Sequence, residues 1–166
     1  MHVPARVNEA LRAHLDRDTP ESLALLQGTI RSEPTFDASC PWHERATFLL
    51  QSDRHDEVIR LINAYMPGAF LSPDAHLMLS HAHEQIRDVD RSRLEAYRAT
   101  TALRVVVDSG SGTRERPWQV LRVIDEYATL RHLRVVPAAQ RLVIDGGREF
   151  DVHACEDGVE RWFELV

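Results

Sequence analysis

Three side chains that could form a catalytic set alternate along one short segment near the end of the chain. Asp151, His153 and Cys155 share one face of a predicted strand, where they could serve as orienter, base and nucleophile. Residues two apart on a strand lie about 7 Å apart, too far for a tight Cys–His hydrogen bond. No oxyanion donor is predicted nearby. We therefore expect an exposed polar face with an incidental thiol, and keep a thiol hydrolase with Cys155 as nucleophile as the alternative.

The densest histidine cluster, His76, His81 and His83, lies in a predicted helix. A helical metal pair needs histidines three or four residues apart, whereas these are separated by five, two and seven. His76 and His83 share a face but lie about 10 Å apart along the helix axis. The spacing therefore predicts no metal site and no cofactor. We instead expect His76, His83 and Arg87 to contact a protein partner.

The elements that carry these residues change type across residues 108–120. Upstream, apolar residues recur at helical spacing, beginning with the stripe Val3, Val7, Ala10, Leu11 and Leu15. Thr19-Pro20 and Ser72-Pro73 are typical helix starts. Six helices are predicted, near residues 4–16, 20–32, 42–51, 55–65, 73–87 and 91–106.

Two sets of positions within these helices are related by a constant shift of 34 residues, the tetratricopeptide period. The first set is Trp42, Ala46, Leu49, Val58, Ile62 and Tyr65, and the second is His76, Ser80, His83, Ser92, Ala96 and Ala99. The alternative is an ordinary helical bundle with coincidental spacing. Stacked helical hairpins would leave a concave face suited to a peptide or protein.

Downstream of residue 110, the pattern predicts a small β-α-β-β-β tail packed on the last helical hairpin. The expected strands cover residues 118–124, 141–145, 149–156 and 159–165, with a short helix starting at Asp125. Six residues are expected to face a core: Phe150, Val152, Ala154, Val159, Phe163 and Leu165. Trp162 falls opposite Phe163 and is expected to be exposed, forming a contact site with Arg161.

The fold class is therefore α+β, with a repeat-like helical body over residues 1–109 and an α/β tail over residues 110–166. The segment Gly110–Thr113 is expected to be a turn-forming linker, because neither a preceding strand nor a lysine completes a phosphate loop. We expect the two parts to fold as one cooperative unit, with the tail capping the helices.

The tail also carries a family resemblance. It is similar to the tail of an uncharacterised bacterial family, a domain of unknown function with a helical N-terminal part. The similarity covers residues 45–155 and implies the fold but no activity. Exported lipoproteins occur in that family, but no lipobox-type cysteine lies near Met1. The residues that carry it are Gly110–Thr113, Pro117, Val120, Val123, Asp125–Tyr127, Leu130, Leu133, Gln140, Leu142, Asp145-Gly146 and Phe150–Val152.

Composition narrows the classes of partner. The chain has 166 residues and a formal net charge of -6, which argues against nucleic acid and anionic membranes. All 20 basic residues are arginines. Cys40 and Cys155 form no disulfide framework. The first ten residues lack the apolar run of a signal peptide, so we expect a cytoplasmic protein.

Together these features predict a non-catalytic protein-binding module that uses a helical-repeat groove. The expected partner is a protein or peptide, and the expected contact residues are His76, His83, Arg87, Arg161 and Trp162. A narrower hypothesis is an immunity-type inhibitor of a bacterial toxin, since an acidic protein complements a basic toxin. The alternative from another class is the thiol-dependent hydrolase described above.

Overall fold

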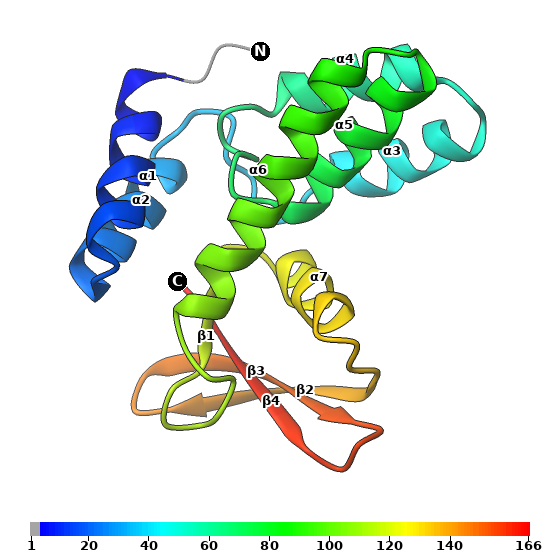
Figure 1. The fold of residues 1–166 in the computed structure, drawn as a ribbon. Helices are drawn as coiled ribbons and strands as arrows, with labels where there is room; N and C mark the ends of the chain where they lie inside the picture. The colour runs from blue at the N-terminus through cyan, green and yellow to red at the C-terminus, as the bar shows by residue number, and fades with distance from the viewer. Residues whose placement is uncertain (1–3) are drawn as a thin grey trace. The chain divides into compact units, whose positions relative to one another are not determined.

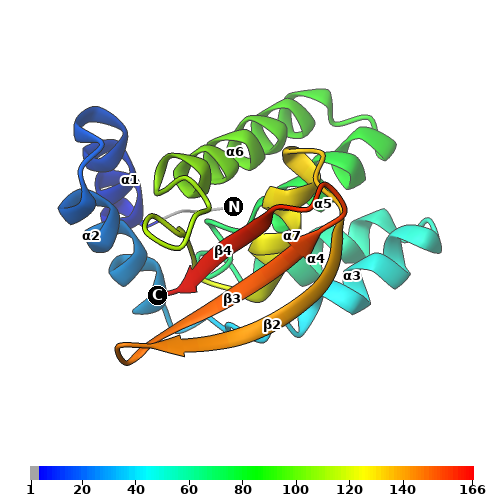
Figure 2. The ribbon, with the colours of Figure 1, turned by 90° about the horizontal axis from the view of Figure 1, so that it is seen from below.

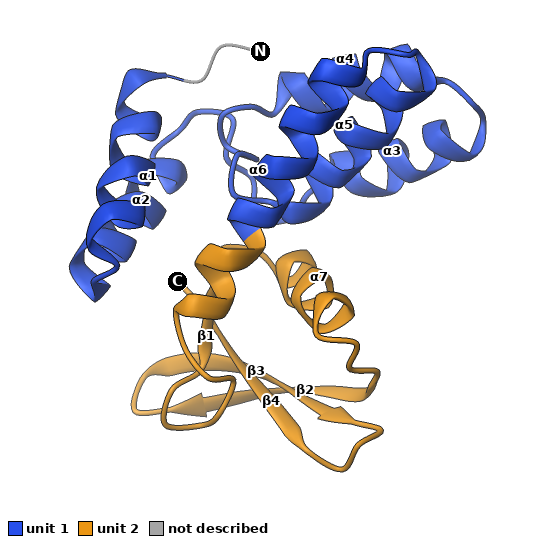
Figure 3. Cartoon of the chain, viewed as in Figure 1, with its two compact units in different colours: residues 1–102 blue, residues 103–166 orange. Residues whose placement is uncertain are grey.

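The computed structural model describes residues 4–166 and has a series of helices followed by a small sheet (Figure 1). This confirms the predicted α+β class with a helical N-terminal part and a β-containing tail. The chain divides into two compact units, residues 1–102 and residues 103–166 (Figure 3). Val3, the first residue of the expected apolar stripe, lies outside the described residues.

The helices of the first unit follow the expected limits closely. They are α1 (Ala5–Arg17), α2 (Pro20–Arg31), α3 (Trp42–Gln51), α4 (His55–Ala64), α5 (Pro73–Gln85) and α6 (Val89–Asp108), whose last turns belong to the second unit. The Thr19 hydroxyl caps α2 by accepting a hydrogen bond of 3.3 Å from the Ser22 N–H. The sixth helix, expected near residues 91–106, already begins at Val89.

Apolar side chains spaced by three and four residues hold these helices together. α1 packs against α2, and α4 packs against both α3 and α5. The buried side chains of α3 and α4 include Trp42, Ala46, Leu49, Val58 and Ile62, which are the apolar positions of the sequence pattern. Among residues 4–166, no helix is both long and apolar enough to cross a bilayer.

The second unit is a four-stranded mixed sheet with one helix of its own. Its elements are β1 (Trp118–Val120), α7 (Val123–His132), β2 (Pro137–Asp145), β3 (Arg148–Cys155) and β4 (Glu160–Leu165). The strand order is β1-β4-β3-β2, with β1 parallel to β4 and the other pairs antiparallel. The first strand is shorter than expected, because the chain turns into α7 at Val123.

The turn between β2 and β3 is a two-residue glycine turn. Gly146 and Gly147 have φ values of 59° and 81°, as a two-residue type I′ turn requires. This turn sets the register of the β2–β3 ladder, in which Val143 pairs with Phe150. β2 forms one edge of the sheet (Figure 2).

The sheet buries apolar residues on both faces, not on one. One cluster comprises Val106, Trp118, Val120, Leu130, Cys155 and Phe163. The other comprises Phe150, Val152 and Trp162. The expectation that Phe150, Val152 and Phe163 share a face is therefore wrong, and Val159 is half exposed.

Trp162 is buried, so its expected exposure is also wrong. The loop that precedes β1 approaches Trp162: the carbonyl of Gly112 accepts a 3.0 Å hydrogen bond from the Trp162 N–H. The guanidinium of Arg114 lies 5.8 Å from the indole centroid. On the sheet, the ring of Phe150 meets the indole edge to face at 5.9 Å.

Candidate functional site

The face of β3 that carries Asp151, His153 and Cys155 is buried, which corrects the expected exposed polar face. The reason is α7, which lies against this face. Oε2 of Glu126 lies 2.7 Å from Nε2 of His153. The ring of Tyr127, the next residue of α7, lies edge to face with the His153 ring at 5.2 Å. The sequence pattern could place the three residues on one face but not reveal the helix above it.

The Cys155 thiol has the surroundings of a structural cysteine. Its Sγ donates to the backbone carbonyl of His153 at 3.6 Å, while the His153 ring bonds to Glu126. Burial raises the pKa of the thiol, and the nearby Arg161 only partly offsets this. A nucleophilic cysteine needs a lowered pKa and an accessible sulfur. The arrangement therefore lacks the thiol–imidazole contact that the hydrolase hypothesis requires.

Glu126 and His153 form a buried neutral pair. Burial, together with the neighbouring Asp151 carboxylate, raises the pKa of Glu126 to about 9. Burial lowers the pKa of His153. Both groups are therefore uncharged near pH 7. Since both side chains are fully buried, no substrate reaches them while α7 is in place.

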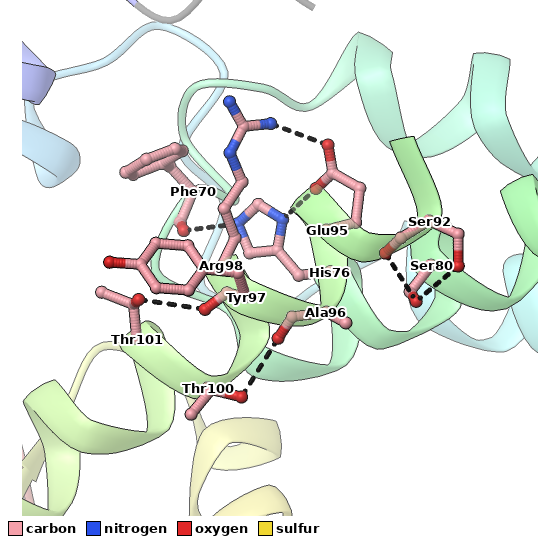
Figure 4. Close-up of polar contacts among 10 residues, drawn as sticks. All are labelled: Phe70, His76, Ser80, Ser92, Glu95, Ala96, Tyr97, Arg98, Thr100 and Thr101. Carbon is pink, nitrogen blue, oxygen red and sulfur yellow. Dashed lines mark hydrogen bonds and ion pairs between the residues drawn. The ribbon is translucent and has the colours of Figure 1, made fainter. Parts of the chain in front are cut away.

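His76 is also fully buried, so it cannot serve as the exposed partner contact expected from the sequence. Its Nε2 lies 2.8 Å from the carbonyl oxygen of Phe70, and its Nδ1 lies 2.6 Å from Oε2 of Glu95 (Figure 4). The carbonyl oxygen of Phe70 can only accept a hydrogen bond. Burial would raise the pKa of Glu95, but hydrogen bonds from His76 and Arg98 lower it further than burial raises it. Glu95 is therefore a carboxylate. Both ring nitrogens of His76 therefore lie within hydrogen-bond distance of acceptor oxygens.

The other expected partner-binding residues are dispersed. His83 is buried, with Nδ1 3.6 Å from Asp88, and burial lowers its pKa. Arg87 is exposed in the turn after α5. Arg161 is partly buried and pairs with Asp157 at 2.8 Å. Three of the five expected contact residues (His76, His83 and Trp162) are thus buried by their own unit.

The first unit has a groove other than the one expected from the sequence, since none of the described residues that line it is His76, His83 or Arg87. It has a volume of about 340 Å³ and lies between α1, the end of the segment before α5, and α6. Its apolar lining consists of Leu11, Leu15, Phe70, Leu71, Leu94, Tyr97 and Ala102. Its polar lining consists of Asn8, Arg12, Arg98 and Thr101. Leu94 and Tyr97 project from α6 and remain exposed, Tyr97 at 67%.

His76, Glu95, Arg98 and Phe70 form a network of contacts beside this groove (Figure 4). Two of them, Phe70 and Arg98, also line the groove. Arg98 donates to Oε1 of Glu95 at 2.7 Å and lies 5.9 Å from the centroid of the Phe70 ring. Phe70 in turn meets the His76 ring edge to face at 5.6 Å. Glu95 therefore bridges the His76 ring and the Arg98 guanidinium.

The charge of the groove follows from this arrangement. Among the described residues its lining contains Arg12 and Arg98 and no acidic side chain. Arg12 is exposed on α1, and Arg98 is hydrogen-bonded to Glu95. The groove thus combines apolar walls with two guanidinium groups. This combination fits an apolar side chain together with a carboxylate.

One sequence signal could have indicated the groove. Leu11 and Leu15 lie four residues apart on α1, beside the buried stripe of Val7, Ala10 and His14. Leu94, Tyr97 and Thr101 repeat the same spacing on α6. When a neighbouring helix covers only some of the apolar positions of a helix, the remaining apolar positions form a second contact surface.

Comparisons with protein-family models, with curated proteins and with solved structures give no match to this chain. Within residues 4–166, no group of three or more histidine, cysteine or acidic side chains is arranged to hold a metal ion.

Proposed function

We propose that this chain is a non-catalytic protein-binding module whose groove between α1 and α6 takes a short segment of a partner protein. The observation that carries the proposal is the exposed apolar lining of that groove, with Tyr97 67% exposed beside Leu94 and Leu15. Exposed aromatic and aliphatic side chains around a concavity are typical of interaction sites. A volume of about 340 Å³ is suited to one or two anchoring side chains.

The groove chemistry specifies the segment. Its apolar walls favour a leucine-sized or aromatic anchor, and Arg12 and Arg98 favour a carboxylate beside that anchor. A basic segment would be repelled, because the lining has no acidic residue to receive it. The proposed ligand is therefore a short peptide segment that combines an apolar anchor with Asp, Glu or a terminal carboxylate.

A peptide-display selection on the full chain tests this proposal. Enriched peptides should carry an apolar residue next to an acidic one. Tyr97→Ala should weaken their binding at least tenfold, as loss of an aromatic hot spot of about 1.4 kcal/mol or more does. Arg12→Glu should also weaken binding, through charge reversal.

The matched control is Leu25→Ala on α2, which is 60% exposed but does not line the groove. This variant should bind as the parent does. Peptides whose affinity is unchanged by Tyr97→Ala and Arg12→Glu would place binding elsewhere and contradict the proposal.

We further propose that the helices of the first unit are related to tetratricopeptide hairpins. In support, Trp42 and His76 are both buried 34 residues apart, as are Leu49 and His83. The register is imperfect, since Ile62 is buried whereas Ala96 is exposed. A designed variant that restores large-to-small tetratricopeptide packing at these positions should raise the melting temperature.

A narrower form of the proposal is that the partner is a basic bacterial toxin, neutralised in the cytoplasm. The supporting feature is the net charge of -6, which favours a basic partner outside the arginine-lined groove. Co-expression with a toxin encoded beside this chain should rescue growth. Survival that is unaffected by the chain would contradict this version.

The thiol hydrolase receives less support from the geometry than the binding module. Burial raises the pKa of Cys155, so a neutral-pH alkylating agent should react with it more slowly than with a free thiol. The control is the same reaction after unfolding in urea, where Cys40 and Cys155 should both react. Fast alkylation of Cys155 in the folded chain would restore the hydrolase hypothesis.

A further inference from the structure

The edge strand β2 (Pro137–Asp145) leaves one row of backbone hydrogen-bonding groups open. Within the described chain it pairs only with β3. The two-residue turn makes Asp145 and Arg148 a hydrogen-bonded pair, so the backbone groups of Val143 and Arg141 also point toward β3. Those of Gln140, Leu142 and Ile144 therefore point away from the sheet.

This edge also exposes apolar side chains. Leu142 and Ile144 are 60% and 68% exposed, on the sheet face that also carries Asp151. Edge strands are normally protected by prolines, bulges or charges. In β2, the proline and the register irregularity lie at the Pro137–Ala139 end, and the only charged residues of the stretch 140–145 are Arg141 and Asp145, which have opposite signs. Such a strand is a template for another strand.

The sequence of the open stretch is complementary to itself in one antiparallel register. If two copies pair about Val143, Arg141 of each lies opposite Asp145 of the other, which places two opposite-charge pairs across the interface. Leu142 then lies opposite Ile144 of the second copy. We propose that the chain forms a two-fold symmetric dimer through β2, which joins two four-stranded sheets into one eight-stranded sheet.

Backbone geometry allows this register. Leu142 and Ile144 both present outward N–H and C=O groups, so they can form the hydrogen-bonded pair, and the two Val143 residues form the non-hydrogen-bonded pair at the axis. Neighbouring registers are less favourable. Pairing about Arg141 sets two guanidinium groups opposite each other, and pairing about Leu142 sets Arg141 opposite a valine.

The charges beside the edge extend the same pattern. Arg141 pairs with Glu160 at 2.8 Å, and Asp145 pairs with Arg114 at 2.7 Å. All four side chains are about half exposed, so they can reorient toward a second copy. In the dimer the signs alternate along Arg114, Asp145, Arg141 of the second copy and its Glu160. The strand edge therefore favours a second copy of this chain over an uncharged apolar strand.

Sedimentation equilibrium of the full chain at about 100 µM tests the proposal. The parent should be a dimer. Arg141→Asp and Asp145→Arg should each shift the dimer toward monomer by at least tenfold in Kd, since each creates two like-charge contacts. The double charge reversal restores the opposite signs and should restore the dimer. Circular dichroism of each variant checks that the hairpin is folded.

A cross-link identifies the register. Val143→Cys places two thiols at the axis, where paired Cα atoms of a non-hydrogen-bonded pair lie about 4.5 Å apart, so mild oxidation should give a disulfide-linked dimer. Ala139→Cys on the same strand is the control. It should not cross-link, because position 139 lies four residues from the axis and the two thiols are therefore far apart. A monomeric parent overturns the proposal. A dimer that tolerates both single charge reversals overturns it equally, since it then uses another surface.

Discussion

Replacement of Glu126 by glutamine should stabilise the second unit at neutral pH. Burial and Asp151 raise the pKa of Glu126 to about 9, from an ordinary value of 4.5. The native state must therefore bind a proton that the unfolded chain has released at pH 7. Over about 2.5 pH units, at about 1.4 kcal/mol for each unit, this costs about 3 kcal/mol. Glutamine keeps the shape of the neutral acid without that cost.

The sign of the pH dependence follows from the raised pKa. The contribution of Glu126 to stability is fully present below pH 4.5 and is lost progressively as the pH rises to about 9. His153 acts in the opposite direction, because its lowered pKa makes stability fall as the pH drops through 6.5 and below. The interval from pH 7 to 8.5 therefore isolates Glu126. Across it the free energy of unfolding should fall by about 2 kcal/mol in the parent.

Urea unfolding followed by tryptophan fluorescence provides the measurement, because Trp118 and Trp162 both lie in the second unit. Glu126→Gln should gain about 3 kcal/mol at pH 7 and lose the slope between pH 7 and 8.5. Glu149→Gln, at an exposed position of β3, is the control. It should keep the parent's dependence of the free energy of unfolding on pH. A parent that shows no slope, or a Glu126→Gln variant that keeps it, would refute the reasoning.

Three further predictions concern packing. His76→Ala leaves the buried Glu95 carboxylate with one hydrogen-bonding partner fewer and should cost about 3–5 kcal/mol in the free energy of unfolding. His81→Ala, at an exposed position, should cost little. Gly112→Ala should cost about 2–4 kcal/mol, because φ is 68° and the new Cβ would lie 2.5 Å from the Trp118 ring. Gly158→Ala, at a similar φ but with no atom within 4 Å of the new Cβ, should cost only about 1 kcal/mol. Equal urea midpoints for the Gly112 and Gly158 variants would contradict this account. Truncation after Ser109 should cause aggregation, because it removes the strands that bury Val106. A soluble, monomeric 1–109 fragment would falsify the expected cooperative unit.

The limits of most helices and strands could be read from the sequence, because they depend on neighbouring residues. Thr19-Pro20 and Ser72-Pro73 start α2 and α5 through caps and a missing N–H. The two glycines after Asp145 supply the positive φ values of the hairpin turn. Errors occurred where two local signals overlapped, as at Val123, where the strand pattern runs directly into a helix start.

The surroundings of the candidate residues depended on tertiary structure. Alternation placed Asp151 and His153 on one face, but only the packing of α7 buries that face and brings Glu126 to His153. Likewise, helical spacing placed His76 on a face, but only the folded chain buries it and brings Glu95 and the carbonyl of Phe70 to its ring. The groove requires side chains from α1 and α6 together. Backbone periodicity is set by hydrogen bonds between residues close in sequence, whereas burial, charge state and concavity are set by side chains that meet only after folding.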